Sequence, residues 1–184
     1  MLVMDTDYAP IIKRARGGDR KSWTVLFKRY QRRLYIFIHK ACGNEADALD
    51  LLQDCFVTAI RKIHTLRSIG SFESWLFGIA YHLCLDYAKR KAKHPTPLDE
   101  LEPTAAHDAH SAPPQEIYVA AEQVRQLLDA LGRLPVTQRM AMELYHIEEK
   151  STKEIAGIMN CSEKTVWSRL YLGRDAIKDF LRNI

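Results

Sequence analysis

Apolar residues recur at steps of three and four along the first half of the chain, the spacing of one face of an α-helix. The first stripe comprises Trp23, Leu26, Phe27, Tyr30, Leu34 and Phe37. The second comprises Ala48, Leu51, Leu52, Cys55, Phe56, Ala59, Ile60 and Ile63. The third comprises Phe72, Trp75, Leu76, Ile79, Ala80, Leu83 and Tyr87. The pattern predicts three amphipathic helices, with a break at Gly43-Asn44 and a loop at 68–71 in which Ser71 is the expected N-cap of the third helix.

The same spacing returns in the second half of the chain. One stripe, ended by Gly132, comprises Ile117, Ala121, Val124, Leu127, Leu128 and Leu131. Pro135 is expected to open the next helix, because the first amide of a helix has no partner to lose. That helix should run to about Ile147, with Met140, Leu144 and Ile147 facing inward.

A capping box and a short turn follow this helix. Ser151-Thr152-Lys153-Glu154 has the spacing that lets Ser151 and Glu154 satisfy each other's backbone amides. After a short apolar helix, Asn160-Cys161-Ser162 predicts a turn, and Ser162 can cap a further helix that contains Val166 and Leu170. Two short helices joined in this way predict a helix-turn-helix, whose second helix would enter a major groove. The alternative is an ordinary helical hairpin with a solvated polar face.

The two halves are separated by a stretch that differs from both in composition. Residues 94–115 hold five of the seven prolines, and residues 96–120 hold five acids and no base. Such a segment cannot bury enough apolar surface to order itself, so it predicts an extended acidic linker. No segment alternates like a strand. We therefore predict an all-α fold with two small helical domains, 1–93 and 116–184, joined by the linker 94–115.

Composition limits the class of protein. The chain has 184 residues, a net charge of +4 and 47% apolar residues, which is typical of a soluble globular protein. It has no apolar run of about 18 residues and no secretory leader, so we expect a cytoplasmic protein without direct membrane association. Residues 1–95 carry 17 Lys and Arg against nine acids. That excess predicts a polyanionic partner or, equally, a solvated basic surface.

Taken together, the two halves resemble the compact sigma-70-type initiation factors of bacterial RNA polymerase, in the extracytoplasmic-function group. In the front half the resemblance lies in Asp47-Ala48-Leu49-Asp50-Leu51-Leu52-Gln53-Asp54-Cys55-Phe56 and in Ser71-Phe72-Glu73-Ser74-Trp75-Leu76-Phe77-Gly78-Ile79-Ala80. In the back half it lies in Cys161-Ser162-Glu163-Lys164-Thr165-Val166-Trp167-Ser168-Arg169-Leu170. The resemblance implies a front domain like sigma region 2 and a back domain like sigma region 4.

The family also implies partners and site residues. The implied partners are core RNA polymerase, through its clamp coiled coil and flap, promoter DNA and an anti-sigma factor. The residues matching the polymerase-binding positions are Asp47, Asp50, Gln53, Asp54 and Phe56. Those matching the element that reads and opens the −10 promoter region are Arg61, Lys62, Arg67, Ser71, Tyr81, His82, Lys89 and Arg90. Those matching the −35-reading helix are Ser162, Lys164, Thr165, Trp167, Ser168, Arg169 and Tyr171.

Some residues depart from the family's usual pattern. Gly78 and Tyr81 stand where arginines are common, and His82 where asparagine is common. Trp167 and Leu172 replace residues that are commonly basic. Fewer cations predict weaker phosphate binding and a flatter salt dependence. Phe72 and Trp75 lie on the buried stripe, whereas Tyr81 and His82 lie off it and are the better DNA candidates.

Two other classes of protein compete with this interpretation. A metal site would need more ligands than His39 with Cys42 or His107 with His110 provide. A catalytic cysteine is not favoured either, because Cys55 lies on a buried stripe. We therefore predict no catalytic residue, no metal and no cofactor. A stand-alone helix-turn-helix regulator with an all-helical N-terminal domain is the second alternative. It would bind promoter DNA without needing the acidic helix face at 47–54.

Overall fold

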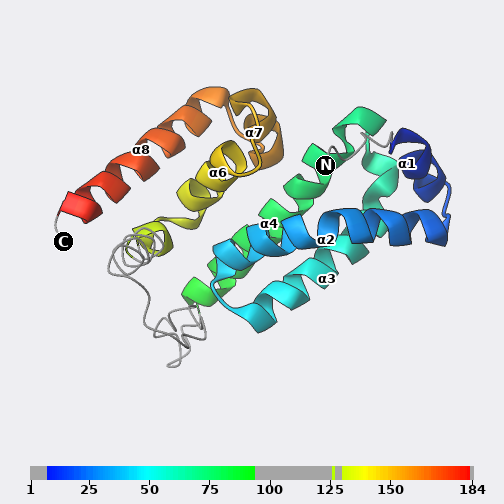
Figure 1. Cartoon of the computed structure of the whole chain (residues 1–184), viewed down its shortest axis with the longest axis horizontal. Helices are drawn as coiled ribbons and strands as arrows, with labels where there is room; N and C mark the ends of the chain where they lie inside the picture. The colour runs from blue at the N-terminus through cyan, green and yellow to red at the C-terminus, as the bar shows by residue number, and fades with distance from the viewer. Residues whose placement is uncertain (1–7, 94–125, 127–129, 183–184) are drawn as a thin grey trace, which may run out of the picture. The chain divides into compact units, whose positions relative to one another are not determined.

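The computed structural model describes residues 8–93, 126 and 130–182, and its regular elements there are all helical (Figure 1). In chain order they are α1 (Ala9–Arg16), α2 (Arg20–Cys42), α3 (Glu45–Lys62), the 3₁₀ turns η1 (Ile63–Thr65) and η2 (Ile69–Ser71), α4 (Phe72–Lys93), α6 (Val136–His146), α7 (Thr152–Met159) and α8 (Glu163–Arg182). The all-α prediction is confirmed. None of these helices is both long and apolar enough to cross a membrane.

The chain divides into two compact units, with a boundary after Asp86 inside α4 and with Gly157–Asn160 grouped with the first unit. We call α1 to α4 the front bundle and α6 to α8 the back bundle. The predicted domain limits, 1–93 and 116–184, stay a prediction. The linker 94–115 and most of the stripe that begins at Ile117 lie outside the described residues.

The predicted break between the first two long helices is confirmed, and side chains cap both helices. The Asp19 carboxylate accepts hydrogen bonds from the amides of Lys21 and Ser22, at 3.2 and 3.1 Å, and so starts α2. Gly43 ends α2 with φ +72°, a conformation that glycine adopts without strain, and its amide bonds the His39 carbonyl. The Asn44 side chain then accepts the Asp47 amide at 3.0 Å and starts α3.

Aromatic rings hold the front bundle together. Phe72, 1% exposed, has its ring centroid 6.5 Å from that of Trp23 and 5.7 Å from that of Tyr30. The Trp23 indole donates to the Ala15 carbonyl at 3.1 Å, which fastens α1 to α2. Arg33 and Glu73 form a two-pronged ion pair, with both N···O distances at 3.1 Å, so α2 and α4 are also joined by charge.

The buried face of α4 differs from the predicted stripe. Phe72, Leu76 and Ala80 are buried as expected, but Phe77, Tyr81 and Cys84 are buried as well. Ile79, Leu83 and Tyr87, predicted to be inward, are only half-buried. Apolar residues surround most of this helix, so their spacing does not single out one face.

Three residues predicted to be inward are on the surface, and the first is Phe27 of α2, which is 40% exposed. Ile60 at the end of α3 is 51% exposed, and Ile147 just after α6 is 58% exposed. Ile60 lies at the edge of its stripe, about 100° around the helix from Ala59, and Ile147 lies just beyond the end of α6. These predictions are wrong, while the rest of the α3 stripe is buried.

The back bundle has a smaller core. Part of it is a cluster in which Ala130, Leu134 and Ile177 pack with partly buried Leu131, Met142 and Phe180, and further residues of α6 to α8, among them Met140, Leu144 and Leu170, are buried as well. Gly173 allows this packing, because a Cβ on it would lie 2.7 Å from the Met142 Sδ atom. The helix from Pro135 to Ile147 is confirmed within one residue at each end, with Pro135 as N-cap and Ile147 as C-cap.

Candidate nucleic-acid and protein interfaces

The helix-turn-helix is built as its capping residues predict. The Ser151 amide donates to Glu154 Oε2 at 2.9 Å, and the Glu154 amide donates back to Ser151 Oγ at 3.3 Å. Ser162 Oγ accepts the Thr165 amide at 3.1 Å and starts α8. The Thr152 hydroxyl donates to Glu163, which ties the start of α7 to the start of α8. Both predicted caps are confirmed.

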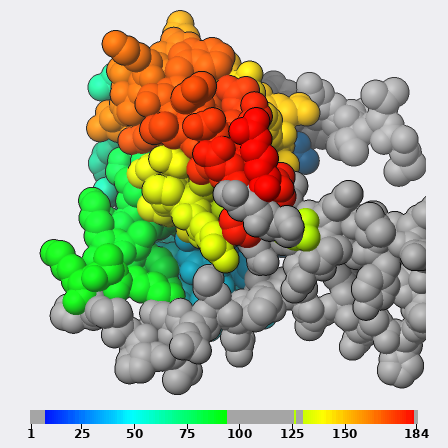
Figure 2. Space-filling view, turned by 90° about the vertical axis from the view of Figure 1, so that its left-hand side faces the viewer, coloured from blue at the N-terminus to red at the C-terminus, as the bar shows by residue number. Residues whose placement is uncertain are grey.

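One face of α8 carries three of the seven residues predicted to read the −35 region. Val166, Leu170, Gly173 and Ile177 face the core of the back bundle. Lys164, Ser168 and Tyr171, at steps of four and three, lie on the opposite side and are exposed. Figure 2 shows α8, coloured orange to red, at the surface of the back bundle. This side has the polarity and accessibility that a groove-binding helix needs.

The other predicted −35 residues flank this exposed face. Trp167 is 49% exposed and has its ring centroid 6.5 Å from that of Tyr145, which the sequence did not single out because it adjoins the α6 stripe. Thr165 is half-buried, and its hydroxyl is hydrogen-bonded to that of Ser162 at 2.8 Å. Arg169 is half-buried and donates to Cys161 Sγ at 3.6 Å. Ser162 and Arg169 therefore help to hold the turn.

The loop between α3 and α4, residues 63–71, is held by hydrogen bonds at both ends, and we call it the anchored loop. Leu66 is 1% exposed and fixes its middle. Thr65 donates to the Lys62 carbonyl at 2.8 Å and accepts the Trp75 indole N–H at 3.3 Å. The predicted −10 residues Arg61, Lys62, Arg67 and Ser71 are exposed on or beside this loop. The Ser71 hydroxyl donates to the Ser68 carbonyl at 2.8 Å instead of capping α4, so that prediction is wrong.

Three predicted −10 residues further along α4 are exposed, namely His82, Lys89 and Arg90. Trp75, His82 and Lys89 follow one another at seven-residue steps, so they share a face of the helix. His82 Nδ1 lies 2.7 Å from the Gly78 carbonyl oxygen. Tyr81 is 1% exposed, so its expected position off the buried face is wrong. It lies beside Phe77 and Cys84, which are buried too.

The acidic residues of α3 lie on one face, as their spacing predicts. Asp50, Gln53 and Asp54 are exposed and Asp47 is half-buried. Phe56, predicted as a surface contact, is only 6% exposed and packs on Phe27 with ring centroids 4.6 Å apart. Phe27, 40% exposed, is the ring that reaches the surface there. Phe56 therefore supports this surface from beneath.

Exposed apolar residues accompany the acids of α3. Leu49, Val57 and Ile60 are 51%, 38% and 51% exposed. Their exposure could be predicted from the sequence, because α3 has more apolar residues than one buried stripe can hold. We call Asp50, Gln53, Asp54, Leu49 and Val57 the α3 face. It combines charge with apolar area, which suits a protein partner better than a nucleic acid.

The residues singled out as possible metal ligands or nucleophiles can be placed only in part. Among them, no three His, Cys, Asp or Glu side chains form a group that could hold a metal ion. The Cys42 thiol donates to the His39 carbonyl at 3.8 Å, so this pair meets through the backbone. Burial raises the pKa of the Cys55 thiol to about 12, which keeps it protonated. His107 and His110 lie outside the described residues.

Comparisons with known proteins match both bundles. The family model described as Sigma-70 region 2 matches residues 26–94, and the one described as Sigma-70, region 4 matches residues 124–177. Over 95% of its length the chain is 28% identical to the ECF RNA polymerase sigma-E factor of Haemophilus influenzae, covering 94% of that protein. The factor of the same name from Escherichia coli is 27% identical, over 91% of this chain and 90% of its own length.

Two solved structures share the fold. One is CnrH in complex with the cytosolic domain of CnrY, with a TM-score of 0.68, 21% identity and coverage of 95% of this chain and 97% of that one. The other is the sigma factor RpoE in complex with the anti-sigma factor NepR from Bartonella quintana. Its TM-score is 0.68 at 21% identity, with 88% of this chain and 98% of that chain covered.

Proposed function

Because the chain belongs to the sigma-70 family of bacterial RNA polymerase factors, in the extracytoplasmic-function group, we propose that it is an alternative sigma factor that directs core polymerase to particular promoters. The observation that carries this proposal is the order of the two bundles. A region 2 bundle with an acidic helix face precedes a region 4 helix-turn-helix whose second helix is exposed. A stand-alone regulator would not need the first of these.

We propose that the α3 face binds the clamp coiled coil of the polymerase. Its exposed carboxylates, Asp50 and Asp54, suit a partner helix rich in arginine. Leu49 and Val57 add apolar area that association would bury. Charge would then set orientation and approach, and the apolar contacts would slow dissociation.

We propose that the anchored loop and α4 open the −10 region. Strand opening requires that an unpaired base be held away from its neighbours while cations support the displaced strand. Arg61, Lys62 and Arg67 lie at the loop, and His82 and Lys89 continue along α4. Trp75 acts as a positioning residue, because its indole holds Thr65 and so the loop.

We propose that α8 reads the −35 region from the major groove. Lys164 and Ser168 can meet phosphates or base edges, and the Tyr171 ring can meet the methyl group of thymine. Trp167 extends this apolar contact where a cation would be usual in the family. Fewer cations shift recognition from phosphate attraction toward shape and apolar contact, so we expect tight promoter binding only within the polymerase complex.

The direct test is transcription with purified parts. Core polymerase alone and core polymerase with the chain are given genomic fragments, and the transcript ends are mapped. The proposal expects defined start sites only when the chain is present. A stand-alone regulator would instead bind promoter DNA by itself and leave core polymerase unbound and unselective.

A double variant tests the α3 face. Asp50→Ala with Gln53→Ala should weaken binding to core polymerase about tenfold or more, since both groups are exposed and close together. The matched control, Gln138→Ala with Asp175→Ala, removes the same kinds of group from the back bundle. Retention of the double variant on immobilised core polymerase, equal to that of the control, would refute the assignment of this face.

We also propose that a protein antagonist, an anti-sigma factor, holds the chain inactive. One structural neighbour, the RpoE factor of Bartonella quintana, is in complex with the anti-sigma factor NepR. In this chain, Leu49, Val57 and Ile60 leave apolar area uncovered, and a masking protein would bury it. An antagonist bound to the α3 face should block core binding in wild type and lose affinity for the Asp50→Ala, Gln53→Ala variant but not for its control.

The domain limits and the place of action follow from this function. We propose that 1–93 and 116–184 act as separate modules and that the acidic linker 94–115 spans the polymerase between them. The chain adds no chemistry of its own, because the polymerase forms the phosphodiester bonds. Its place of work is the cytoplasm, where core polymerase and the chromosome are.

A further inference from the structure

The positive charge of the front bundle is concentrated on α1 and α2, which carry none of the predicted promoter-reading residues. Residues 9–42, which form α1 and α2, carry ten Lys and Arg and a single acid, Asp19. Residues 43–93, which hold the α3 face, the anchored loop and α4, carry seven bases and six acids. The net excess that suggests a polyanionic partner therefore lies almost entirely on α1 and α2.

Most of these charges are uncompensated. Arg33 is paired with Glu73, and Asp19 is used as the cap of α2. Within the described residues, eight of the ten form no ion pair, namely Lys13, Arg14, Arg16, Arg20, Lys21, Lys28, Arg29 and Arg32. All eight are exposed. A cluster of like charges destabilises a folded chain, and a solvated helix surface ordinarily mixes both signs, as α8 does.

The cations of α2 form a line. Lys21, Lys28 and Arg32 stand at steps of seven and four, so they share one side of the helix. Trp23, Leu26, Tyr30, Leu34 and Phe37 face the core from the other side. The line therefore points away from α3 and α4. At 1.5 Å per residue, its three charges extend over roughly 16 Å of helix.

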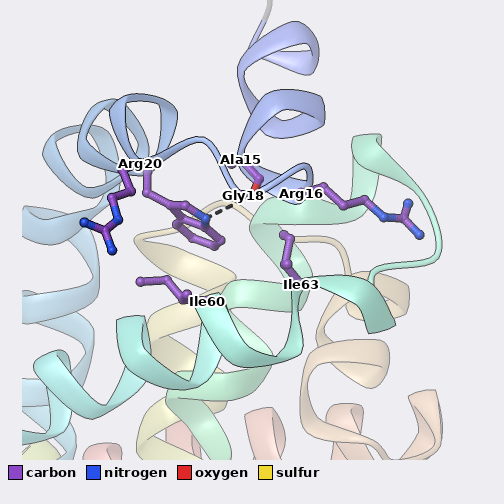
Figure 3. Close-up of a pocket in the computed structure, with 7 residues that line it drawn as sticks. Ala15, Arg16, Gly18, Arg20, Ile60 and Ile63 are labelled. Atoms are coloured by element: carbon purple, nitrogen blue, oxygen red, sulfur yellow. Dashed lines mark hydrogen bonds between the residues drawn. The ribbon is translucent and has the colours of Figure 1, made fainter.

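The basic surface continues around the start of α2. Arg16 and Arg20 lie on either side of a hollow of about 580 Å³ whose lining includes Trp23, Ile60 and Ile63. Figure 3 shows the two guanidinium groups extending outward from the two sides of this hollow. Ile63 belongs to η1 and α1 contacts η2, so the cations of α1 adjoin the anchored loop.

We infer that the outer side of α1 and α2 is a sequence-independent binding surface for the phosphate backbone of duplex DNA. We call Lys21, Lys28 and Arg32 the α2 line. Two exposed neighbours on this side, Val25 and Ile36, are apolar and offer no hydrogen bond to a base edge. Five of these eight cations without an ion pair are arginines, whose planar fork suits phosphate oxygens. The surface supplies attraction without sequence preference, which offsets the cations missing from α4 and α8.

The test uses the full chain and a short fluorescent duplex without promoter elements. Anisotropy titrations over a range of salt compare wild type with Lys21→Gln, Lys28→Gln, Arg32→Gln. If three phosphate contacts are lost, the slope of log K against log salt falls by about 2 to 3, and binding weakens roughly a hundredfold at ~0.1 M salt. Thermal unfolding should show equal or greater stability, because like-charge repulsion is relieved.

A matched triple variant controls for net charge. Arg133→Gln, Lys178→Gln, Arg182→Gln removes the same charge from exposed positions of the back bundle. Equal salt slopes for the two triple variants, or an α2-line variant that binds like wild type, would overturn the proposal. Loss of binding to phosphatidylglycerol vesicles with duplex binding intact would assign the surface to anionic membranes instead.

The result of this test can be distinguished from the result of the test of the proposed function. The α2-line variant should still bind core polymerase and select the same start sites at low salt, because the α3 face is intact. Loss of core binding by this variant would make the line part of the polymerase contact and overturn the inference. Wild-type chain that selects no start site would refute the sigma assignment and leave the duplex measurement valid.

Discussion

Helices α4 and α8 have similar lengths and similar proposed tasks, yet their surfaces are organised in different ways. In α8 a narrow buried line of four residues, from Val166 to Ile177, leaves the opposite side polar. In α4 buried residues cover a wide arc from Phe72 to Cys84, and half-buried apolar residues flank it. In α8 the contrast between apolar and polar residues is enough to set which side is buried. In α4 the buried side is set by the neighbouring helices that pack against it.

This difference sets what each helix tolerates. The outer residues of α8 contact little, so they are free to change with the DNA sequence that is read. The rings of α4 hold both the bundle and the anchored loop, so a change intended to alter DNA contact there also alters stability. We expect recognition to vary more readily at α8 than at α4.

The largest effect is expected for the buried side of α4. Phe77→Ala should lower the free energy of unfolding by about 3–5 kcal/mol, since Phe77 is fully buried and packs edge-on against Phe37. Ile79→Ala, on the side that periodicity predicts to be inward, should cost only about 1–2 kcal/mol. Urea unfolding of the two variants measures both. An Ile79→Ala cost equal to that of Phe77→Ala would show that the faces of α4 are assigned wrongly.

A smaller effect, on binding alone, is expected at α8. Tyr171→Ala should weaken binding of the polymerase complex to a −35 duplex by about 1–3 kcal/mol, because one apolar base contact is lost. Stability should stay within about 0.5 kcal/mol of wild type, since Tyr171 is 64% exposed. Promoter binding by gel shift and thermal unfolding are measured together. A stability loss as large as the binding loss would contradict the contrast with α4.

The next largest effect, on stability, is expected at the residues that cap the starts of helices. Ser151→Ala and Ser162→Ala should each lower stability by about 1 kcal/mol, because each removes a hydrogen bond to an amide in the first turn. Ser71→Ala should change it by less than about 0.5 kcal/mol, because that hydroxyl caps nothing at α4. Ser168→Ala, exposed on α8, is the control. Equal losses at Ser71 and Ser162 would mean that α4 is capped after all.

The smallest effect concerns the start of α2 and acid. A hydrogen bond from the Ser22 hydroxyl, with bonds from the Ser22 and Lys21 amides, lowers the pKa of Asp19 from its usual 3.8. The carboxylate therefore adds stability above that usual pKa, and this stability is lost as pH falls through the lower folded value. Asp19→Asn should flatten the curve of stability against pH below 3.8 and leave its shape near neutrality unchanged. An unchanged acid limb would contradict the role of this cap.

Much of the fold could be predicted from local chemistry. The Gly43-Asn44 break, the Ser151–Glu154 capping box and the Ser162 cap depend only on residues within a few positions of one another. The α8 surface could be predicted too, because its buried line alternates with charge. The exposure of Asp50 and Asp54 follows from the same spacing rule on α3.

The remaining differences come from contacts between helices that spacing does not contain. Phe56 and Phe27 both lie at the edge of a stripe, and only the packing of α2 on α3 decides that Phe56 is inside and Phe27 outside. Ile60 is exposed because it lies at the edge of its stripe, about 100° around the helix from the buried Ala59. Tyr81 is buried because α4 has no strongly polar side in its middle turns, so helical period alone could not place it.

The hydrogen bond between the Trp75 indole and Thr65 has a consequence for the speed of promoter opening. A segment that is already shaped before its target arrives loses less conformational freedom on binding, about 0.5–1.5 kcal/mol for each side chain that need not be immobilised. Trp75→Phe would keep the ring and leave Thr65 with only its bond to the Lys62 carbonyl, so the loop should sample more shapes while the bundle stays folded. If the loop opens the −10 region as we propose, we expect this N–H to shorten the time between encounter and an open complex without contacting a base.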